Sequence, residues 1–394
     1  MRKHSEALSV FALVIICTCH RALVCSAQPL VKAIFNFGDS TTDTGTNTYL
    51  PNPAFLANFT PYGQTYFNRP TGRFSDGRLV IDILAAFFKL PLLLPYLTPN
   101  FTYYDNGVNF ASAGSGLLDS TKAGMVVNIR EQVQQFVKVK ESLVSTHGSL
   151  SVKLSMARSL FTISSGSNDI YYSYFPNQTT PEAFTDTMIN ELEKTLTALH
   201  AEGANKFVLV GLSPLGCVPS QVLASGECNE SLNQIARLYN KKLSAFQLRI
   251  TIKLLGSIVV VANVYDTLDG LIKNGEIFGF TQGSNACCGG GPFRGAVGNQ
   301  CGFQDSAGND LFTKCTDEEL DHYVFWDFFH PTDRAYQTLA ALFLFVFCYH
   351  VQTQINAMPV STETRWNLLW DSSPITTSSG ACRMLCNRSV KNLP

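Results

Sequence analysis

The sequence Ala33-Ile-Phe-Asn-Phe-Gly-Asp-Ser40 joins an apolar run to a polar turn. Residues 33–37 have the length and composition of a buried β-strand, so Ser40 is expected at the carboxyl end of that strand. Open α/β sheets bind their ligands at this edge. Gly38-Asp39-Ser40 would also suit an ordinary polar turn, so the rest of the chain must decide what the segment means.

Strand patterns alternate with helix patterns after this segment. This order, without an obvious linker, predicts one three-layer α/β domain at residues 28–347, with a doubly wound, mostly parallel sheet and helices on both faces. Further strands are predicted at residues 107–111, 159–163, 206–210 and 257–262, and helices at 129–144, 181–200, 232–255 and 331–345.

Residues 51–97 are rich in Pro, Gly and aromatic side chains. We interpret them as an insertion over the edge of the sheet. Lining of a substrate cleft is the alternative role for this insertion.

The charge balance argues against several classes of partner. The 394-residue chain has 29 Lys and Arg residues and 30 Asp and Glu residues. It has no basic stripe interleaved with aromatic residues and no polybasic patch, so neither nucleic-acid binding nor stable membrane insertion is expected. A hydrophobic content of 45% predicts a well-filled core. We expect a monomer.

The amino terminus has the pattern of a signal peptide. Basic residues at 2–4 precede an apolar run at 8–17 that is too short to span a bilayer, and small residues follow at 25–27. We therefore assign residues 1–27 to a signal peptide and expect a secreted protein; a buried amino-terminal helix is the alternative. The chain stays apolar to residue 351 and turns polar from 352 to 394, and we expect a poorly ordered tail at residues 348–394.

Cysteine usage agrees with export. Three of the 12 cysteines lie in the predicted signal peptide, and six of the others cluster in loop-like stretches rich in Gly, Pro and Asn. Such clusters are typical of disulfides formed in an oxidising compartment. A zinc site is the alternative, but no His lies among these residues and no Cys-x-x-Cys pair occurs. The disulfide candidates, with their pairing left open, are Cys217, Cys228, Cys287, Cys288, Cys301 and Cys315.

Five Asn-x-Ser/Thr sequons follow the signal segment. Each is a weak match by itself, but a secreted chain makes them credible glycan acceptors on surface loops. The predicted acceptors are Asn58, Asn100, Asn177, Asn229 and Asn387.

A second polar segment, far along the chain from Ser40, supplies the partners that a serine nucleophile needs. It places Asp327 three residues before His330. A serine hydroxyl is a poor nucleophile until a base removes its proton, and histidine can do so near neutral pH. A carboxylate that accepts the other ring N–H fixes the tautomer of the histidine. We therefore predict a catalytic triad of Ser40, His330 and Asp327.

Two further strand ends offer donors for a developing oxyanion. Gly114 follows the second predicted strand and Asn168 lies in a polar turn after the third. With the backbone N–H of Ser40, the Gly114 N–H and the Asn168 amide would provide three donors at one sheet edge. Their simpler interpretations are a conformational glycine and an Asx turn.

The proposed acid and base also have rivals. Asp327 with Pro331 would suit a helix entry. His322 is a rival base, although it lacks a carboxylate at the same spacing. Asp39 is a rival acid, but it adjoins the serine and is expected to fix the turn.

Four sequence blocks together resemble the plant GDSL esterase/lipase family of the SGNH hydrolase superfamily. They are FNFGDSTTDTG, GVNFASAGSG, GSNDI and VFWDFFHPTD, and the resemblance extends over roughly residues 32 to 344. Leu215-Gly-Cys217 and Ala286-Cys-Cys-Gly289 are further family traits. The chain departs from the family pattern at Thr41, where leucine is usual, and at Ala113, where many members have glycine.

The resemblance implies a flavodoxin-like SGNH hydrolase fold, with Ser40 as nucleophile, Asp327 and His330 completing the triad, and Gly114 and Asn168 in the oxyanion hole. It implies a plant enzyme of the apoplast or cell wall that acts on small acyl esters or lipids without metal or cofactor. We predict hydrolysis of carboxylic esters through an acyl-Ser40 intermediate. Acyl transfer to an alcohol acceptor is one alternative, and a non-catalytic wall or defence protein that binds such ligands is another.

Overall fold

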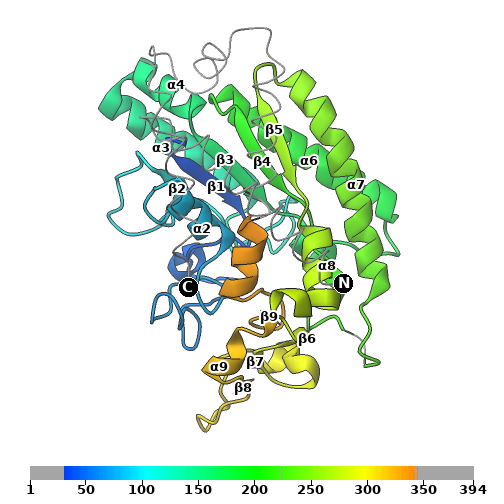
Figure 1. Cartoon of the computed structure of the whole chain (residues 1–394). Coiled ribbons are helices and arrows are strands. Elements are labelled where there is room, and N and C mark those ends of the chain that lie inside the picture. Colours follow the sequence, from blue (N-terminus) through cyan, green and yellow to red (C-terminus); the bar gives the residue numbers. More distant parts are fainter. Residues whose placement is uncertain (1–30, 223, 342–343, 345–394) are drawn as a thin grey trace, which may run out of the picture. The chain divides into compact units, whose positions relative to one another are not determined.

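Five parallel strands form the central sheet of the computed structural model (Figure 1). The strand order β2-β1-β3-β4-β5 is the flavodoxin-like, doubly wound order, which confirms the predicted fold class. Every predicted strand is found, with its ends shifted by two residues at most. The strands are β1 (Ile34–Gly38), β2 (Gly107–Asn109), β3 (Leu160–Ser164), β4 (Lys206–Val210) and β5 (Ile258–Ala262).

The structure describes residues 31–222, 224–341 and 344. Residues 32–340 form one compact unit, which contains the sheet and the candidate active site. The predicted signal peptide at 1–27 and the predicted tail at 348–394 lie outside the described residues. Within the described residues, no helix combines the length and the apolar character that a bilayer span requires.

Helices pack on both faces of the sheet. The helices α3, α6 and α7 cover one face, and α2 with helical residues 333–340 lies on the other (Figure 1). The helices are α2 (Val80–Phe87), α3 (Ile129–His147), α4 (Ser149–Ala157), α5 (Ser167–Tyr172), α6 (Pro181–Ala201), α7 (Glu230–Lys253), α8 (Val264–Asn274) and α9 (Asp317–Leu320), with short 3-10 turns η1 (Thr46–Tyr49), η2 (Leu215–Cys217), η3 (Gly275–Phe278), η4 (Pro292–Arg294) and η5 (Val297–Asn299).

Aromatic side chains fill the core between the sheet and α3, α6 and α7. The rings of Phe35 and Phe161 on the sheet lie 5.1 Å and 5.3 Å from that of Phe136 on α3. Burial of each such side chain stabilises the fold by roughly 1.5–3 kcal/mol. The apolar runs recognised in the sequence form strands because their side chains are buried on the faces of the sheet.

A small second region follows β5, and we call residues 282–325 the disulfide-bridged segment. There β6 (Gln282–Ala286) pairs in parallel with β9 (Tyr323–Phe325), and β7 (Cys288–Gly289) pairs antiparallel with β8 (Thr313–Lys314). All six candidate cysteines form disulfides. Two of the three disulfides lie within this segment, and the third lies at η2. The pairs are Cys287–Cys315, Cys288–Cys301 and Cys217–Cys228.

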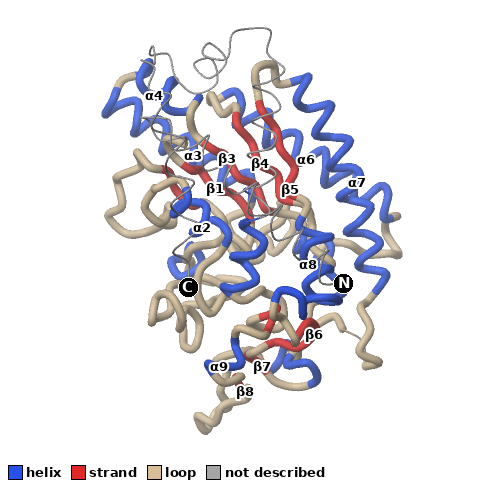
Figure 2. The backbone as a smooth tube through the Cα atoms, viewed as in Figure 1, coloured by secondary structure: helices blue, strands red, loops and turns tan. Residues whose placement is uncertain are grey.

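The insertion at residues 51–97 is mostly loop and contains α2, a helix that its Pro- and Gly-rich composition did not predict (Figure 2). A buried ion pair fixes it internally, since the guanidinium of Arg73 donates to both carboxylate oxygens of Asp82 at 2.8 Å. Arg78 binds Asp333 of the last helix, 2.9 Å from its carboxylate. The insertion is thus attached to the part of the chain that follows His330.

Two predicted details differ in the structure. Asn168 does not lie in a polar turn, because α5 begins at Ser167, directly after Gly166. The last helix begins at residue 333 rather than 331. Its start is later because the Thr332 hydroxyl accepts the N–H of Ala335, which is the geometry of an N-cap.

Candidate active site

The structure brings Ser40, His330 and Asp327 together in one hydrogen-bonded chain. The Nε2 atom of His330 lies 2.8 Å from the Oγ atom of Ser40. The other ring nitrogen, Nδ1, lies 2.9 Å from Oδ2 of Asp327 and 3.0 Å from Oδ1. All three residues are buried, Ser40 being 7% exposed. The arrangement is chemically that of a serine activated by an oriented imidazole.

The end of β1 sets the position of Ser40. Gly38, two residues before Ser40, has φ of +146°, and a Cβ atom there would lie only 2.1 Å from the carbonyl oxygen of Ser164. The side chain of Gln132 accepts the N–H of Gly38 at 2.9 Å and donates to its C=O at 3.0 Å. Glycine is therefore required, and the strand end is fixed from α3 as well as from β3.

A tight turn directs Asp327 toward its own histidine. The Oδ1 atom accepts the backbone N–H groups of Phe329 at 2.8 Å and His330 at 2.7 Å, and the N–H of Trp326 donates to the C=O of His330 at 2.7 Å. Burial raises the pKa of Asp327, but the nearby imidazole charge and these hydrogen bonds outweigh burial, so its pKa lies below the usual value. Asp327 is thus held as a carboxylate.

Asp39, the rival acid, has the opposite electrostatic character. Its Oδ1 atom accepts from the N–H of Thr41 at 3.0 Å and from the Thr41 hydroxyl at 2.8 Å. Burial raises the pKa of Asp39 to about 6, although these hydrogen bonds and the charge of His330 act to lower it. The structure records no hydrogen bond between Asp39 and His330 among the described residues, so Asp39 fixes the turn, as its position suggested.

The predicted oxyanion donors surround the same strand end. Among the described residues, the backbone N–H groups of Ser40 and Gly114 donate no hydrogen bond to the protein. The side chain of Asn168 donates one amide hydrogen to the C=O of Ser115 at 2.9 Å, and its amide carries a second hydrogen. The hydroxyl of Ser115 in turn donates to the C=O of Gly38 at 2.7 Å, which connects this loop to the strand end that precedes Ser40.

Two buried carboxylates that sequence reasoning missed hold these loops in shape. Asp43 accepts the N–H of Ala113 at 2.9 Å, one residue before Gly114. Asp169 accepts the N–H of Leu117 at 2.7 Å. Burial raises the pKa of each carboxyl to about 6, against these hydrogen bonds. Asp43 lies in the sequence block FNFGDSTTDTG and Asp169 in the block GSNDI. Their place in these blocks was the one sequence signal that could have identified them.

A further missed residue, Tyr62, comes from the insertion. Its hydroxyl donates to Oδ2 of Asp327 at 2.8 Å, and its side chain is buried. The insertion therefore does more than cover the edge of the sheet. An isolated tyrosine in a loop gives no sequence signal for such a contact.

The remaining predictions fall on the surface or outside the described residues. His322, the rival base, is exposed and its Nδ1 atom faces the C=O of Gly279 at 3.0 Å. The sequons at Asn58, Asn100 and Asn177 are exposed, Asn229 is half-buried, and Asn387 lies outside the described residues.

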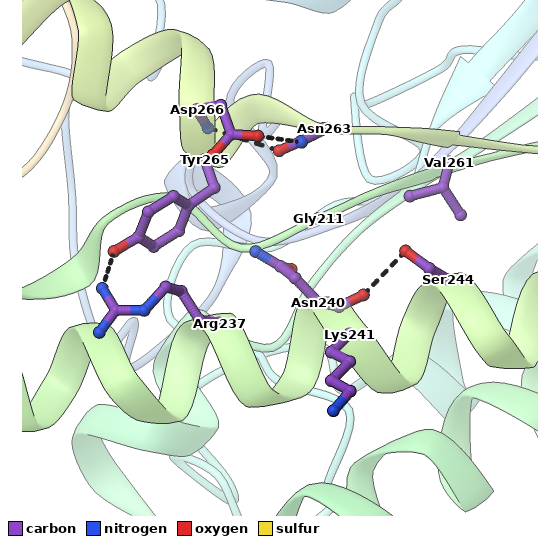
Figure 3. Close-up of a pocket in the computed structure, with 9 residues that line it drawn as sticks. All are labelled: Gly211, Arg237, Asn240, Lys241, Ser244, Val261, Asn263, Tyr265 and Asp266. Atoms are coloured by element: carbon purple, nitrogen blue, oxygen red, sulfur yellow. Dashed lines mark hydrogen bonds between the residues drawn. The ribbon is translucent and has the colours of Figure 1, made fainter.

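A separate cavity of about 230 Å³ lies between α7 and the carboxyl ends of β4 and β5 (Figure 3). Arg237 and Tyr265 are on its wall, joined by a 2.7 Å hydrogen bond from the guanidinium to the phenol. None of the three triad residues lines it, so this cavity is distinct from the candidate active site. Within the described part of the chain, no cluster of His, Cys, Asp or Glu has the arrangement of a metal site.

Known proteins are similar to this chain over most of its length. A family model described as GDSL-like lipase/acylhydrolase matches residues 34–343. GDSL esterase/lipase 6 of Arabidopsis thaliana is 36% identical over 336 residues, covering 81% of this chain and 87% of the relative. GDSL esterase/lipase 2 of the same plant is 35% identical over 325 residues, covering 79% and 85%. A GDSL lipase of Tanacetum cinerariifolium is 31% identical over 342 residues, covering 86% and 90%. The chain therefore belongs to the GDSL esterase/lipase family of hydrolases.

Proposed function

We propose that the protein is a secreted serine esterase that hydrolyses small acyl esters or lipids through an acyl-Ser40 intermediate. The observation that carries this proposal is the continuous chain from Ser40 Oγ to His330 Nε2, at 2.8 Å, and from His330 Nδ1 to Asp327, at 2.9 Å. Membership of the GDSL esterase/lipase family supports ester hydrolysis as the reaction class.

The reaction follows from this arrangement in two halves. Ser40 Oγ attacks the ester carbonyl carbon while His330 Nε2 takes the hydroxyl proton, and the bond to the alcohol breaks after His330 returns that proton to the alcohol oxygen. Water then attacks the acyl-serine with His330 again as base, releasing the acid and restoring Ser40. The oxyanion of each tetrahedral intermediate would accept from the N–H groups of Ser40 and Gly114 and from the Asn168 amide.

Secretion rests on three features that agree with one another. Residues 1–27 have a signal-peptide pattern, three disulfides are present in the described residues, and three sequons are exposed. Disulfides of this kind persist in oxidising compartments. We place the mature enzyme, residues 28–347, outside the cell, in the apoplast or cell wall.

The decisive experiment uses a fluorophosphonate probe and a panel of esters on the purified mature protein. We expect covalent labelling at Ser40 and release of free acid, and loss of both in Ser40→Ala while the far-UV circular dichroism spectrum stays unchanged. Labelling that persists in Ser40→Ala would overturn the assigned nucleophile. A folded wild-type protein that neither reacts nor hydrolyses any ester would favour a binding protein instead.

The same assay distinguishes hydrolysis from acyl transfer. The ester panel is repeated with an alcohol acceptor and a labelled acyl group. Free acid as the main product supports hydrolysis, whereas a labelled new ester that grows with acceptor concentration would assign the enzyme to acyl transfer.

A further inference from the structure

We infer that Tyr62 is a positioning residue for the triad, acting through Asp327 to hold the carboxylate that orients His330. This inference rests on the proposed function of Ser40, His330 and Asp327. The hydrogen-bonded chain then has four members, and the last one comes from the insertion rather than from the sheet or the disulfide-bridged segment.

The contact occupies the one face of Asp327 that the backbone leaves open. Among the described residues, Oδ1 accepts two backbone N–H groups, and Oδ2 accepts only the phenol of Tyr62, at 2.8 Å, besides the ring nitrogen of His330. Asp327 is fully buried, so no bulk water replaces a missing donor. Without the phenol, Oδ2 would have the imidazole as its single partner, and the carboxylate could rotate away from the geometry that Nδ1 requires.

The environment of Tyr62 keeps it protonated and immobile. Burial and the adjacent charge of Asp327 raise its pKa well above the ordinary value, so the phenol always donates. Its ring packs edge-on against Phe59, Phe74 and Trp326, with centroid distances of 5.4, 6.1 and 6.0 Å. Phe74 also packs against the ring of His330, 4.8 Å away. Tyr62 is 2% exposed and its hydroxyl donates to Asp327, so we assign it no direct contact with substrate.

The direction of its electrostatic effect follows from the orientation of the O–H bond. The positive end of that dipole points at Asp327, and hence toward the imidazole beyond it. Removing it leaves the carboxylate charge less compensated, which favours the protonated imidazolium. The other titratable groups that interact with this pair are Asp39, which acts on His330, and Tyr336, which interacts with Asp327, Asp39 and Asp76.

The test is Tyr62→Phe, which removes the hydroxyl and keeps the ring contacts. We expect kcat to fall about tenfold with KM little changed. The variant loses a hydrogen bond to the charged Asp327, a residue to which we assign no contact with substrate. The acidic limb of the kcat/KM profile, which reports protonation of the free base, should move to higher pH by several tenths of a unit. The matched control is Tyr104→Phe, whose phenol donates to the C=O of Phe101 at 2.9 Å and which should change neither quantity.

A purely structural role for Tyr62 gives different results. Tyr62→Phe would then lower the midpoint of urea unfolding and leave the pH profile of the folded fraction superimposed on that of the wild type, which would overturn the inference. The Asp327→Ala background adds a second measurement, the rate of single-turnover probe labelling. With no carboxylate to hold, Tyr62→Phe should have no further effect there, whereas an equal further loss would also overturn it. Activity surviving in Ser40→Ala would instead reject the proposed function, whatever Tyr62 does.

Discussion

The carboxyl edge of the sheet and the disulfide-bridged segment hold the two halves of the candidate site by different means. Ser40 follows β1, which pairs with β2 and β3 and is fully buried. His330 and Asp327 follow β9, which forms a two-stranded sheet with β6 and, among the described strands, pairs with no other. A two-stranded ladder is marginal by itself, so the second half depends on cross-links and on contacts from other parts of the chain. The sheet therefore fixes the proposed nucleophile, whereas the proposed base must be held in place against it by other contacts.

Asp327→Asn tests the half of the site that follows β9 by removing the charge of the proposed triad acid. It should have the largest effect on kcat. The asparagine has nearly the same shape, but it cannot hold the correct imidazole tautomer or stabilise the imidazolium. We expect kcat to fall by roughly 10⁴. Ester turnover of the purified variant measures this loss.

The control for that variant is Asp321→Asn, an exposed aspartate that follows α9. It should leave turnover unchanged. Retention of more than a tenth of wild-type kcat by Asp327→Asn would show that the carboxylate is not the triad acid.

Asn168→Ala tests the sheet edge. Loss of one oxyanion donor should lower kcat by about 10²–10³ with little change in KM, because the bond strengthens only in the transition state. The control is Asn240→Ala, which removes an amide that binds both the N–H and the C=O of Leu212, at 2.7 and 2.8 Å. That variant should lose stability while its folded fraction keeps its kcat. Equal kcat losses in both variants would remove Asn168 from the oxyanion hole.

Much of this arrangement could be predicted from sequence because it depends on local patterns. Most strands of the sheet lie in short, largely apolar runs whose residues are buried, and such runs stand out from the helices between them. Ser40, Gly114 and Asn168 each follow such a run. Parallel strands bring their carboxyl ends to one edge, so these residues could be expected to meet without knowledge of any contact.

The rest could not be predicted because it depends on tertiary contacts. β6 reads Gln-Gly-Ser-Asn-Ala, without β-branched or aromatic residues, and it exists as a strand through pairing with β9 and the adjacent cross-links. Tyr62 lies in a loop, and its partner Asp327 is 265 positions away in sequence. The signal peptide at residues 1–27 and the poorly ordered tail at 348–394 remain predictions from sequence alone.

The Cys288–Cys301 disulfide tests how far the second half depends on its cross-links. The N–H of Cys288 donates to the C=O of Trp326 at 2.8 Å, so this cysteine lies directly against the strand that leads to Asp327. Replacing both cysteines with serine should lower the free energy of unfolding by about 3 kcal/mol, given the short loop that the bond closes. Esterase activity should be lost at a lower urea concentration than the far-UV signal of the sheet.

The Cys217–Cys228 bond provides the comparison for that experiment. It closes a loop of similar length, with a sequence separation of 11 against 13, but it lies at η2 rather than beside β9. Its removal should destabilise the fold without separating the loss of activity from the loss of structure. Coincident transitions in both double variants would mean that the two halves unfold as one unit.

Asp39→Asn gives the smallest expected effect and isolates the electrostatics of the sheet edge. Burial raises the pKa of Asp39 to about 6 from an ordinary value of 3.8, so its contribution to stability is complete below pH 3.8 and is lost as the pH rises through about 6. Asparagine keeps the acceptor for Thr41 and removes the charge. The variant should therefore lose less stability than the wild type between pH 4 and 7, by at most about 3 kcal/mol, measured by urea unfolding at each pH.

Removing a negative charge near His330 should also move the acidic limb of kcat/KM to lower pH, opposite to the shift expected for Tyr62→Phe. If Asp39→Asn and Tyr62→Phe shift the acidic limb in the same direction, either Asp39 or Asp327 has been assigned the wrong role.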